Sequence, residues 1–153
     1  MEKTLDMKIL SQKRLALVEG LTLAQGTHES LQEGACLMEA VAFVAGEPWS
    51  DHPQCVSPVV AAFCRRWNDD LNNQDRNRLL KPYISRLIGT NTGPTDEERR
   101  AWMLTDWMVR VYMPAWLRLA RLNVQADTVA ALPELVSAQS WETIRPQIEE
   151  AKK

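Results

Sequence analysis

The chain has 153 residues, of which 45% are hydrophobic and 25% are charged. These values are ordinary for a globular protein and exclude a disordered or fibrous chain. The 18 basic and 20 acidic residues give a formal net charge of −2 and are mixed along the chain, which disfavours nucleic acid as a partner. We therefore expect one soluble domain over residues 1–153, with frayed ends at residues 1–7 and 149–153.

Signals for export or membrane insertion are not recognisable in the sequence. The first twenty residues carry charges throughout, and no window approaches the roughly 18 consecutive apolar residues that cross a bilayer. The three cysteines are an odd number, which favours reduced thiols or metal ligands over a disulfide framework. These features predict a cytoplasmic protein without a membrane partner.

Apolar residues recur at helical spacing through most of the chain, and no convincing strand pattern is present. In the first part of the chain the pattern predicts helices over residues 8–24, 33–45, 58–69 and 73–88. Gly46 ends the second helix because glycine readily adopts the left-handed conformation of a C-terminal cap. Ser57 followed by Pro58 begins the third helix. Pro82 kinks or divides the fourth, because proline cannot donate a helical hydrogen bond.

The longest predicted helix begins at Thr95, which forms a capping-box pattern with Glu98. Its tryptophans and other apolar residues cover much of the helix circumference, so we expect several neighbours to bury it. Pro114 should bend this helix. Two short helices follow, at residues 126–137 and 141–151. The sequence thus predicts an all-α fold, a single compact helical bundle of roughly six or seven helices.

Four of the five histidines and cysteines of the chain lie between residues 28 and 55. They are His28, Cys36, His52 and Cys55. Zinc accepts imidazole nitrogen and thiolate sulfur together, and the short spacing from His52 to Cys55 lets one turn offer two ligands. The sequence therefore predicts a structural zinc ion that orders residues 26–57, including the proline-rich loop at 46–57.

Other roles for this segment stay open. Glu39 and Asp51 are alternate zinc ligands, and the spacing is not that of a zinc finger, so the same residues can be ordinary core and loop residues. Asp51 can instead orient the imidazole of His52. A Glu39 buried on an apolar helix must be paired, hydrogen-bonded or bound to metal. Trp49, in the proline-rich loop, either seals the site or anchors a partner.

Three stretches of the chain are distinctive: GTHES, GACLMEAVAFVAGEPWSDHPQCVSPVVAAF and DWMVRVYMPAWLRLA. They resemble a family of small all-helical proteins encoded in bacterial and phage genomes, over most of residues 26–120. The resemblance implies one intact helical domain and brings no enzymatic activity with it. Small phage proteins commonly bind and inhibit a host protein, so the resemblance also suggests a phage-type inhibitor, by association only.

The sequence lacks the motifs of the common serine hydrolases, nucleotide-binding proteins and metalloproteases. It therefore favours a non-enzymatic protein-binding or regulatory module, with structural zinc in the 26–57 segment. The alternative is a metal-dependent hydrolase in which three of the four predicted ligands hold zinc at an open site. Glu39 or Asp51 would then move the proton.

Overall fold

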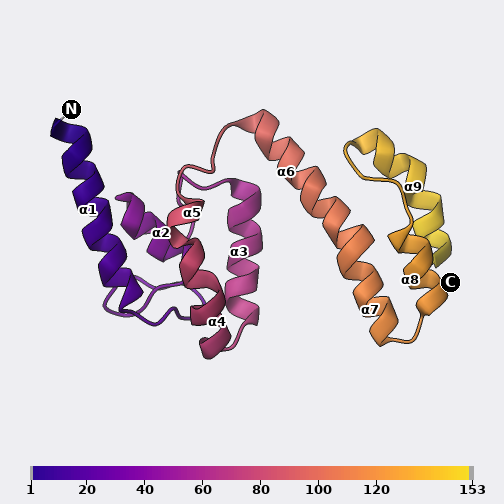
Figure 1. Ribbon diagram of the computed structural model, residues 1–153, viewed down its shortest axis with the longest axis horizontal. Coiled ribbons are helices and arrows are strands. Elements are labelled where there is room, and N and C mark those ends of the chain that lie inside the picture. The colour runs from indigo at the N-terminus through magenta and orange to yellow at the C-terminus, as the bar shows by residue number, and fades with distance from the viewer. Residues whose placement is uncertain (1, 152–153) are drawn as a thin grey trace. The chain divides into compact units, whose positions relative to one another are not determined.

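The structure is a computed structural model that describes the backbone of residues 2–151 and the side chains of residues 11–150. Helices account for 66% of the residues and no strand is present in the described part, which confirms the predicted all-α class. The chain divides into two compact units, residues 1–93 and residues 94–153 (Figure 1). Each unit has its own apolar core. Thermal unfolding tests whether the two units behave as the single domain that the sequence predicts. A single domain unfolds in one transition, whereas independent units unfold in two.

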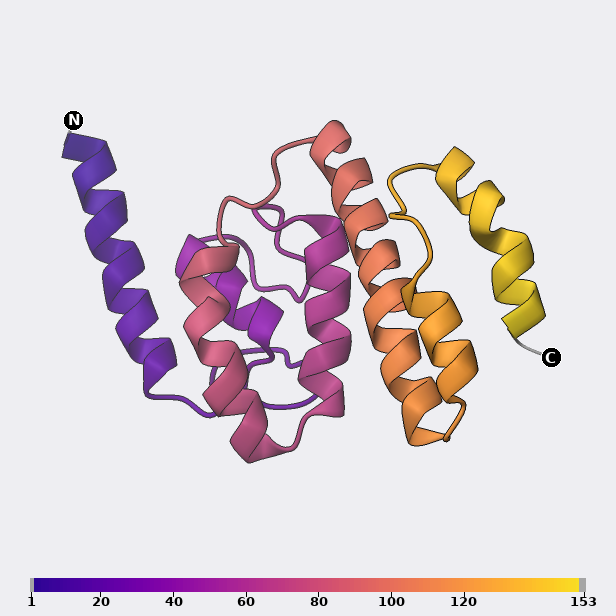
Figure 2. The same cartoon turned by 45° about the vertical axis from the view of Figure 1, so that its right-hand side comes forward.

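Unit 1 is built around a short buried helix. Its elements are α1 (Glu2–Glu19), α2 (Leu37–Ala45), α3 (Pro58–Asp70), α4 (Asn73–Leu80), the 3-10 turn η1 (Lys81–Tyr83) and α5 (Ile84–Leu87). Almost every residue of α2 is buried, and α1, α3 and α5 pack around it (Figure 2). This central position explains why α2 is apolar on all sides.

Most helix ends of unit 1 follow the local signals in the sequence. Gly46 adopts φ +80° at the end of α2, and the Ser57 hydroxyl accepts a hydrogen bond from the Val60 N–H at the start of α3. Pro82 lies in η1, which separates α4 from α5. These three predictions are confirmed.

Two helices of unit 1 begin elsewhere than predicted. Helix α1 spans Glu2–Glu19, so the predicted frayed end is helical from Glu2, and residues 1 and 152–153 lie outside the described residues. Helix α2 begins at Leu37 because Cys36 caps it, with the Cys36 sulfur accepting from the Glu39 N–H. Residues 33–36 are therefore not part of that helix.

Unit 2 contains a long helical rod and two shorter helices. Its elements are α6 (Pro94–Trp107), the π turn η2 (Met108–Tyr112), α7 (Met113–Leu119), α8 (Asn123–Ala130) and α9 (Ala138–Ala151). We call the continuous stretch from α6 to α7 the rod. It begins at Pro94, so Thr95 lies in its first turn and does not cap it as predicted. The core of the unit consists of Val109, Val129, Leu132, Leu135, Ile144 and Ile148.

The disturbance expected at Pro114 takes the form of a π turn. Proline has no backbone N–H, and its ring clashes with the carbonyl four residues earlier in a regular helix. The rod widens just before this proline, where the N–H of Met113 donates to the carbonyl of Met108, five residues back. A π turn holds one more residue than an α turn, so it shifts the register of every residue after it.

Candidate functional site

Glu39 holds the loop that precedes α2. Its carboxylate accepts hydrogen bonds from the backbone N–H of His28 at 2.7 Å and of Cys36 at 2.8 Å, and contacts Nδ1 of His28 at 2.9 Å. Glu39 is only 1% exposed. A carboxylate at that depth needs several donors to offset its lost hydration. The prediction that a buried Glu39 must be hydrogen-bonded is therefore confirmed.

His28 is enclosed by two further residues. The indole Nε1 of Trp49 donates to the His28 carbonyl at 2.7 Å. A Cβ on Gly34, which has φ +142°, would lie 2.8 Å from Cδ2 of the His28 ring. Only glycine leaves room there for the imidazole. Trp49 thus fastens the proline-rich loop to the loop that contains His28.

Glu47 and Asn91 form hydrogen bonds with the main chain of the proline-rich loop at 46–57. The Glu47 carboxylate accepts the backbone N–H of Gln54 at 2.6 Å and of Cys55 at 2.8 Å. Asn91 donates its backbone N–H to the Cys55 carbonyl at 3.1 Å and its amide to the Gln54 carbonyl at 2.8 Å. These contacts satisfy the main chain of Gln54 and Cys55, in the loop that the sequence predicts a zinc ion to order.

The four predicted zinc ligands fall into two groups that contact different carboxylates. His28 and Cys36 lie against Glu39, whereas His52 and Cys55 lie in the proline-rich loop. Among the residues with described side chains, no three His, Cys, Asp or Glu are placed to hold a metal ion together. The residues as arranged do not fit a zinc ion, and the zinc site stays a prediction from the sequence.

The three thiols of the chain are shielded. Burial is the main reason that the pKa of Cys36 rises to about 12 and the pKa values of Cys55 and Cys64 rise to about 11. A thiol with such a pKa keeps its proton at neutral pH and is a poor nucleophile. None of the three therefore resembles an activated catalytic cysteine.

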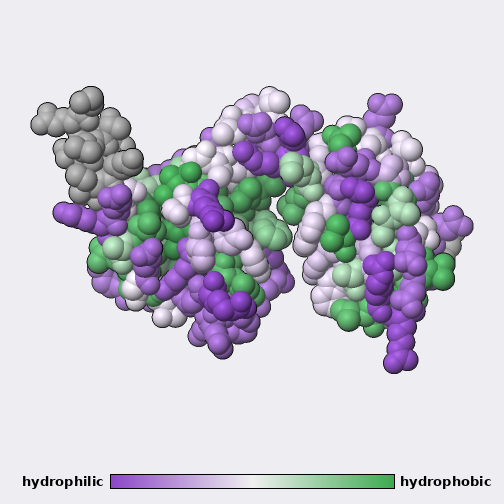
Figure 3. Space-filling model, viewed as in Figure 1, coloured by the Kyte–Doolittle hydropathy of each residue, from purple (hydrophilic) through white to green (hydrophobic). Residues whose placement is uncertain are grey.

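Unit 2 exposes a row of large apolar side chains on the side of the rod that faces away from its own core. Each of them is between 41% and 77% exposed. We call this surface the aromatic face; it consists of Met103, Trp107, Met108, Val111, Tyr112, Trp116 and Leu119. Green side chains also reach the surface of unit 2 in Figure 3. Within the described residues of unit 2, the neighbours that the sequence predicts to bury this side of the helix are not found.

Three rings of the aromatic face form a ladder. The centroids of Trp107 and Tyr112 are 5.3 Å apart and the rings are stacked, while Tyr112 and Trp116 meet edge to face at 6.0 Å. In a regular α-helix, side chains five residues apart point about 140° away from each other. The extra residue of the π turn reduces this offset between Trp107 and Tyr112. The π turn before Pro114 therefore assembles the ladder.

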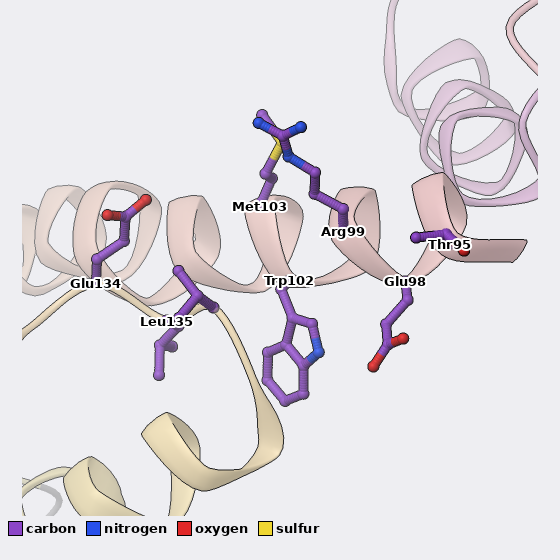
Figure 4. A pocket seen from close by; sticks show the side chains of 8 residues that line it. Thr95, Glu98, Arg99, Trp102, Met103, Glu134 and Leu135 are labelled. Carbon is purple, nitrogen blue, oxygen red and sulfur yellow. The ribbon is translucent and has the colours of Figure 1, made fainter. Parts of the chain in front are cut away.

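A pocket of about 390 Å³ lies beside the aromatic face, between α6 and the segment before α9 (Figure 4). Its lining residues are Thr95, Glu98, Arg99, Trp102, Met103, Glu134, Leu135 and Val136. Trp102 and Glu98 extend from the side of α6 on which Leu135 also lies, whereas Met103 extends from the other side (Figure 4). Because Met103 belongs to both surfaces, the pocket continues the aromatic face.

Asp106 fixes the wall of this pocket. Its carboxylate accepts two hydrogen bonds from Arg110, at 2.5 Å and 2.7 Å, and one from the backbone N–H of Leu135 at 2.9 Å. The Arg110 guanidinium is the main reason that the pKa of the Asp106 carboxyl lies below its ordinary value. The pair thus ties the rod to the segment before α9 with a charge-assisted contact.

Comparison with known proteins adds no relative. The chain matches no protein-family model, no curated protein and no solved structure. The resemblance to bacterial and phage proteins therefore stays a prediction. No helix within residues 2–151 is both long and apolar enough to cross a membrane.

Proposed function

We propose that this chain is a non-enzymatic, cytoplasmic protein-binding module and that it docks its partner on the aromatic face of unit 2. The single observation that carries the proposal is the exposed ladder of Trp107, Tyr112 and Trp116. Tryptophan and tyrosine are the residues most enriched at the energetic centres of protein interfaces. Contiguous exposed apolar surface on a folded domain commonly marks such an interface.

The size of the aromatic face suits a protein partner. Fully buried aromatic side chains each remove about 150–250 Å² from water. The seven side chains of the face, exposed by 41–77%, therefore offer roughly 700 Å². A standard protein interface buries about 800 Å² on each partner. The face is large enough to form the centre of such an interface.

The rings of the face are held in place before a partner arrives. Trp107 stacks on Tyr112, and Tyr112 contacts the edge of Trp116. Each side chain that is already ordered loses less conformational freedom on binding, which saves about 0.5–1.5 kcal/mol for a rotamer-rich residue. The π turn thus contributes to binding by presenting an ordered surface.

Two arginines of the rod next to the face have partners inside unit 2. Arg110 pairs with Asp106, and Arg118 contacts Asp127 at 2.8 Å. Burying an unpaired arginine in an interface would cost several kcal/mol. A partner that covers the face avoids this cost because both arginines are already paired. This pairing supports a mainly apolar mode of recognition.

Inhibition of a host protein, which the family resemblance suggests, is one form that this binding can take. The proposal does not depend on zinc. A metal-dependent hydrolase would need three of His28, Cys36, His52 and Cys55 on one ion, and the structure gives these residues other partners. These contacts do not support the hydrolase alternative.

A capture experiment with matched variants tests the proposal. Three purified proteins would be used as bait: the parent chain, the double variant Trp116→Ala/Leu119→Ala and the control Val124→Ser. Val124 is 78% exposed but lies on α8, outside the aromatic face. We expect parent and control to bind one partner equally and the double variant to bind it at least about tenfold more weakly. Equal binding by the double variant would contradict the proposal.

A further inference from the structure

Unit 1 has a small pocket of its own, between the proline-rich loop and the start of α3. It measures about 140 Å³ and is lined by His52, Pro53, Gln54, Val56, Pro58, Ala61, Arg65 and Asn91. Pro53, Val56 and Ala61 are buried and give the pocket an apolar wall. Arg65 and His52 are basic, and none of the eight lining residues is acidic.

The guanidinium of Arg65 is only partly used by the protein. It donates one hydrogen bond, from its NH1 nitrogen to the Asp51 carbonyl at 3.0 Å. No carboxylate in the described part of the chain forms an ion pair with it. A guanidinium has five N–H donors. Most of those donors are therefore not used by the described part of the chain.

Asp51 orients the second basic group. Its Oδ1 lies 2.5 Å from Nδ1 of His52, so Nε2 is the ring nitrogen left for a ligand. Within the described residues Nε2 has no hydrogen-bond partner, and the His52 side chain is 65% exposed. The ring of His52 therefore lies at the pocket with one nitrogen that the described part of the chain does not use.

The carboxylates of the proline-rich loop do not compete for Arg65. Glu47 accepts the backbone N–H groups of Gln54 and Cys55, and Asp51 is engaged by His52. The apolar wall strengthens an ion pair by excluding water and lowering the local dielectric constant. The electrostatic balance of the pocket therefore favours a negatively charged ligand.

We propose that this pocket binds a compact oxyanion, a carboxylate or phosphate group, on the Arg65 guanidinium and beside the ring of His52. The volume of about 140 Å³ accommodates such a group. It is smaller than the roughly 300–1,000 Å³ that enclose drug-sized ligands. Guanidinium groups match both oxyanions through paired N–H donors. The site lies in unit 1 and is independent of the aromatic face.

The two histidines of the chain make a direct test possible by NMR. Their ring signals would be followed at one fixed pH while sodium phosphate, sodium acetate or sodium chloride is added at matched ionic strength. We expect a saturable shift of the His52 signals with phosphate or acetate, while His28, which Glu39 holds, stays unchanged. The anion that saturates at the lower concentration identifies the preferred source of the oxyanion. An equal response to chloride would overturn the proposal.

Three variants make the test specific. Arg65→Gln removes the guanidinium, Arg65→Lys keeps the charge, and Arg66→Gln removes a neighbouring charge that pairs with Asp70 on the surface. We expect at least tenfold weaker binding in Arg65→Gln, partial binding in Arg65→Lys and unchanged binding in Arg66→Gln. An unchanged His28 signal shows that each variant keeps the fold. Parent-like titration of Arg65→Gln would contradict the site.

Discussion

The carboxylate of Glu39 contacts the imidazole of His28 inside unit 1, with 2.9 Å between Oε2 and Nδ1. The same carboxylate accepts the backbone N–H of His28, so one residue of α2 fixes both the main chain and the ring of a loop residue. The two side chains are only 2% and 14% exposed. Removing one partner of such a contact leaves the other buried without its hydrogen bonds.

The variant Glu39→Gln should lower the free energy of unfolding by about 2–4 kcal/mol. Its amide group would place N–H donors against groups that themselves donate, among them the backbone N–H of Cys36. Urea unfolding measures the change. The exposed Glu29 is the matched control, and Glu29→Gln should change stability by less than about 0.5 kcal/mol. Equal effects of the two substitutions would show that the Glu39 contacts are dispensable.

Gly34→Ala should destabilise unit 1 by about 2–3 kcal/mol, because its φ of +142° strains an alanine and its Cβ would press on the His28 ring. Gly89→Ala is the control. Gly89 also has a positive φ, of +80°, but no atom lies within 4 Å of its added Cβ. We expect Gly89→Ala to lower the melting temperature less than Gly34→Ala does. Similar losses for both glycines would mean that the His28 ring does not restrict residue 34.

The variant Asp106→Asn should lower stability in a pH-dependent way. Arg110 lowers the pKa of Asp106 in the folded state, so folding stabilises the ionised carboxylate. That contribution is present above the ordinary Asp pKa of about 3.9 and disappears as the pH falls through the lowered pKa. We expect a loss of about 1–2 kcal/mol at neutral pH that vanishes in strong acid.

Urea unfolding of the parent and of Asp106→Asn from neutral to acidic pH measures this difference. Asp127→Asn is the control, because the Asp127–Arg118 pair is 73% and 48% exposed and should contribute little. A stability difference for Asp106→Asn that stays constant across the pH range would rule out the carboxylate charge as its cause.

The zinc prediction can be tested on the untagged protein. Because Glu39 and Glu47 already bind the main chain of both loops, we expect a chelator to leave the melting temperature unchanged. Elemental analysis is the second measurement. Nearly one zinc ion per chain in the parent, and none in Cys36→Ser or in His52→Ala, would establish the predicted site. The two groups of ligands would then have to come together around one ion.

Three helix boundaries of unit 1 were predictable because their signals are local. Gly46, Ser57 and Pro82 act through backbone conformation and hydrogen bonds within a few residues, and each does in the structure what its type predicts. The start of α2 was not predictable in this way, because cysteine is not a usual N-terminal cap. Cys36 takes that role together with Glu39, whose side chain reaches back to the Cys36 N–H.

The aromatic face was missed because a hydrophobic pattern does not distinguish a second buried side from an exposed binding surface. A usable signal was present, since Trp107 and Tyr112 are five residues apart just before Pro114, and a π turn aligns that spacing. Nearness in sequence likewise suggested a common metal for His28 and His52. Folding gives each its own carboxylate, and the alternative in which Asp51 orients His52 is the observed arrangement.

Site-specific photo-crosslinking tests the binding proposal most directly. A photoreactive phenylalanine analogue would replace Tyr112 on the aromatic face or, as the control, the exposed Thr143 on α9, in cells of the organism that encodes the chain. Irradiation should give one adduct of defined mass from position 112 and none from position 143. Absence of an adduct at position 112, or the same adducts from both positions, would contradict the aromatic face as the docking surface.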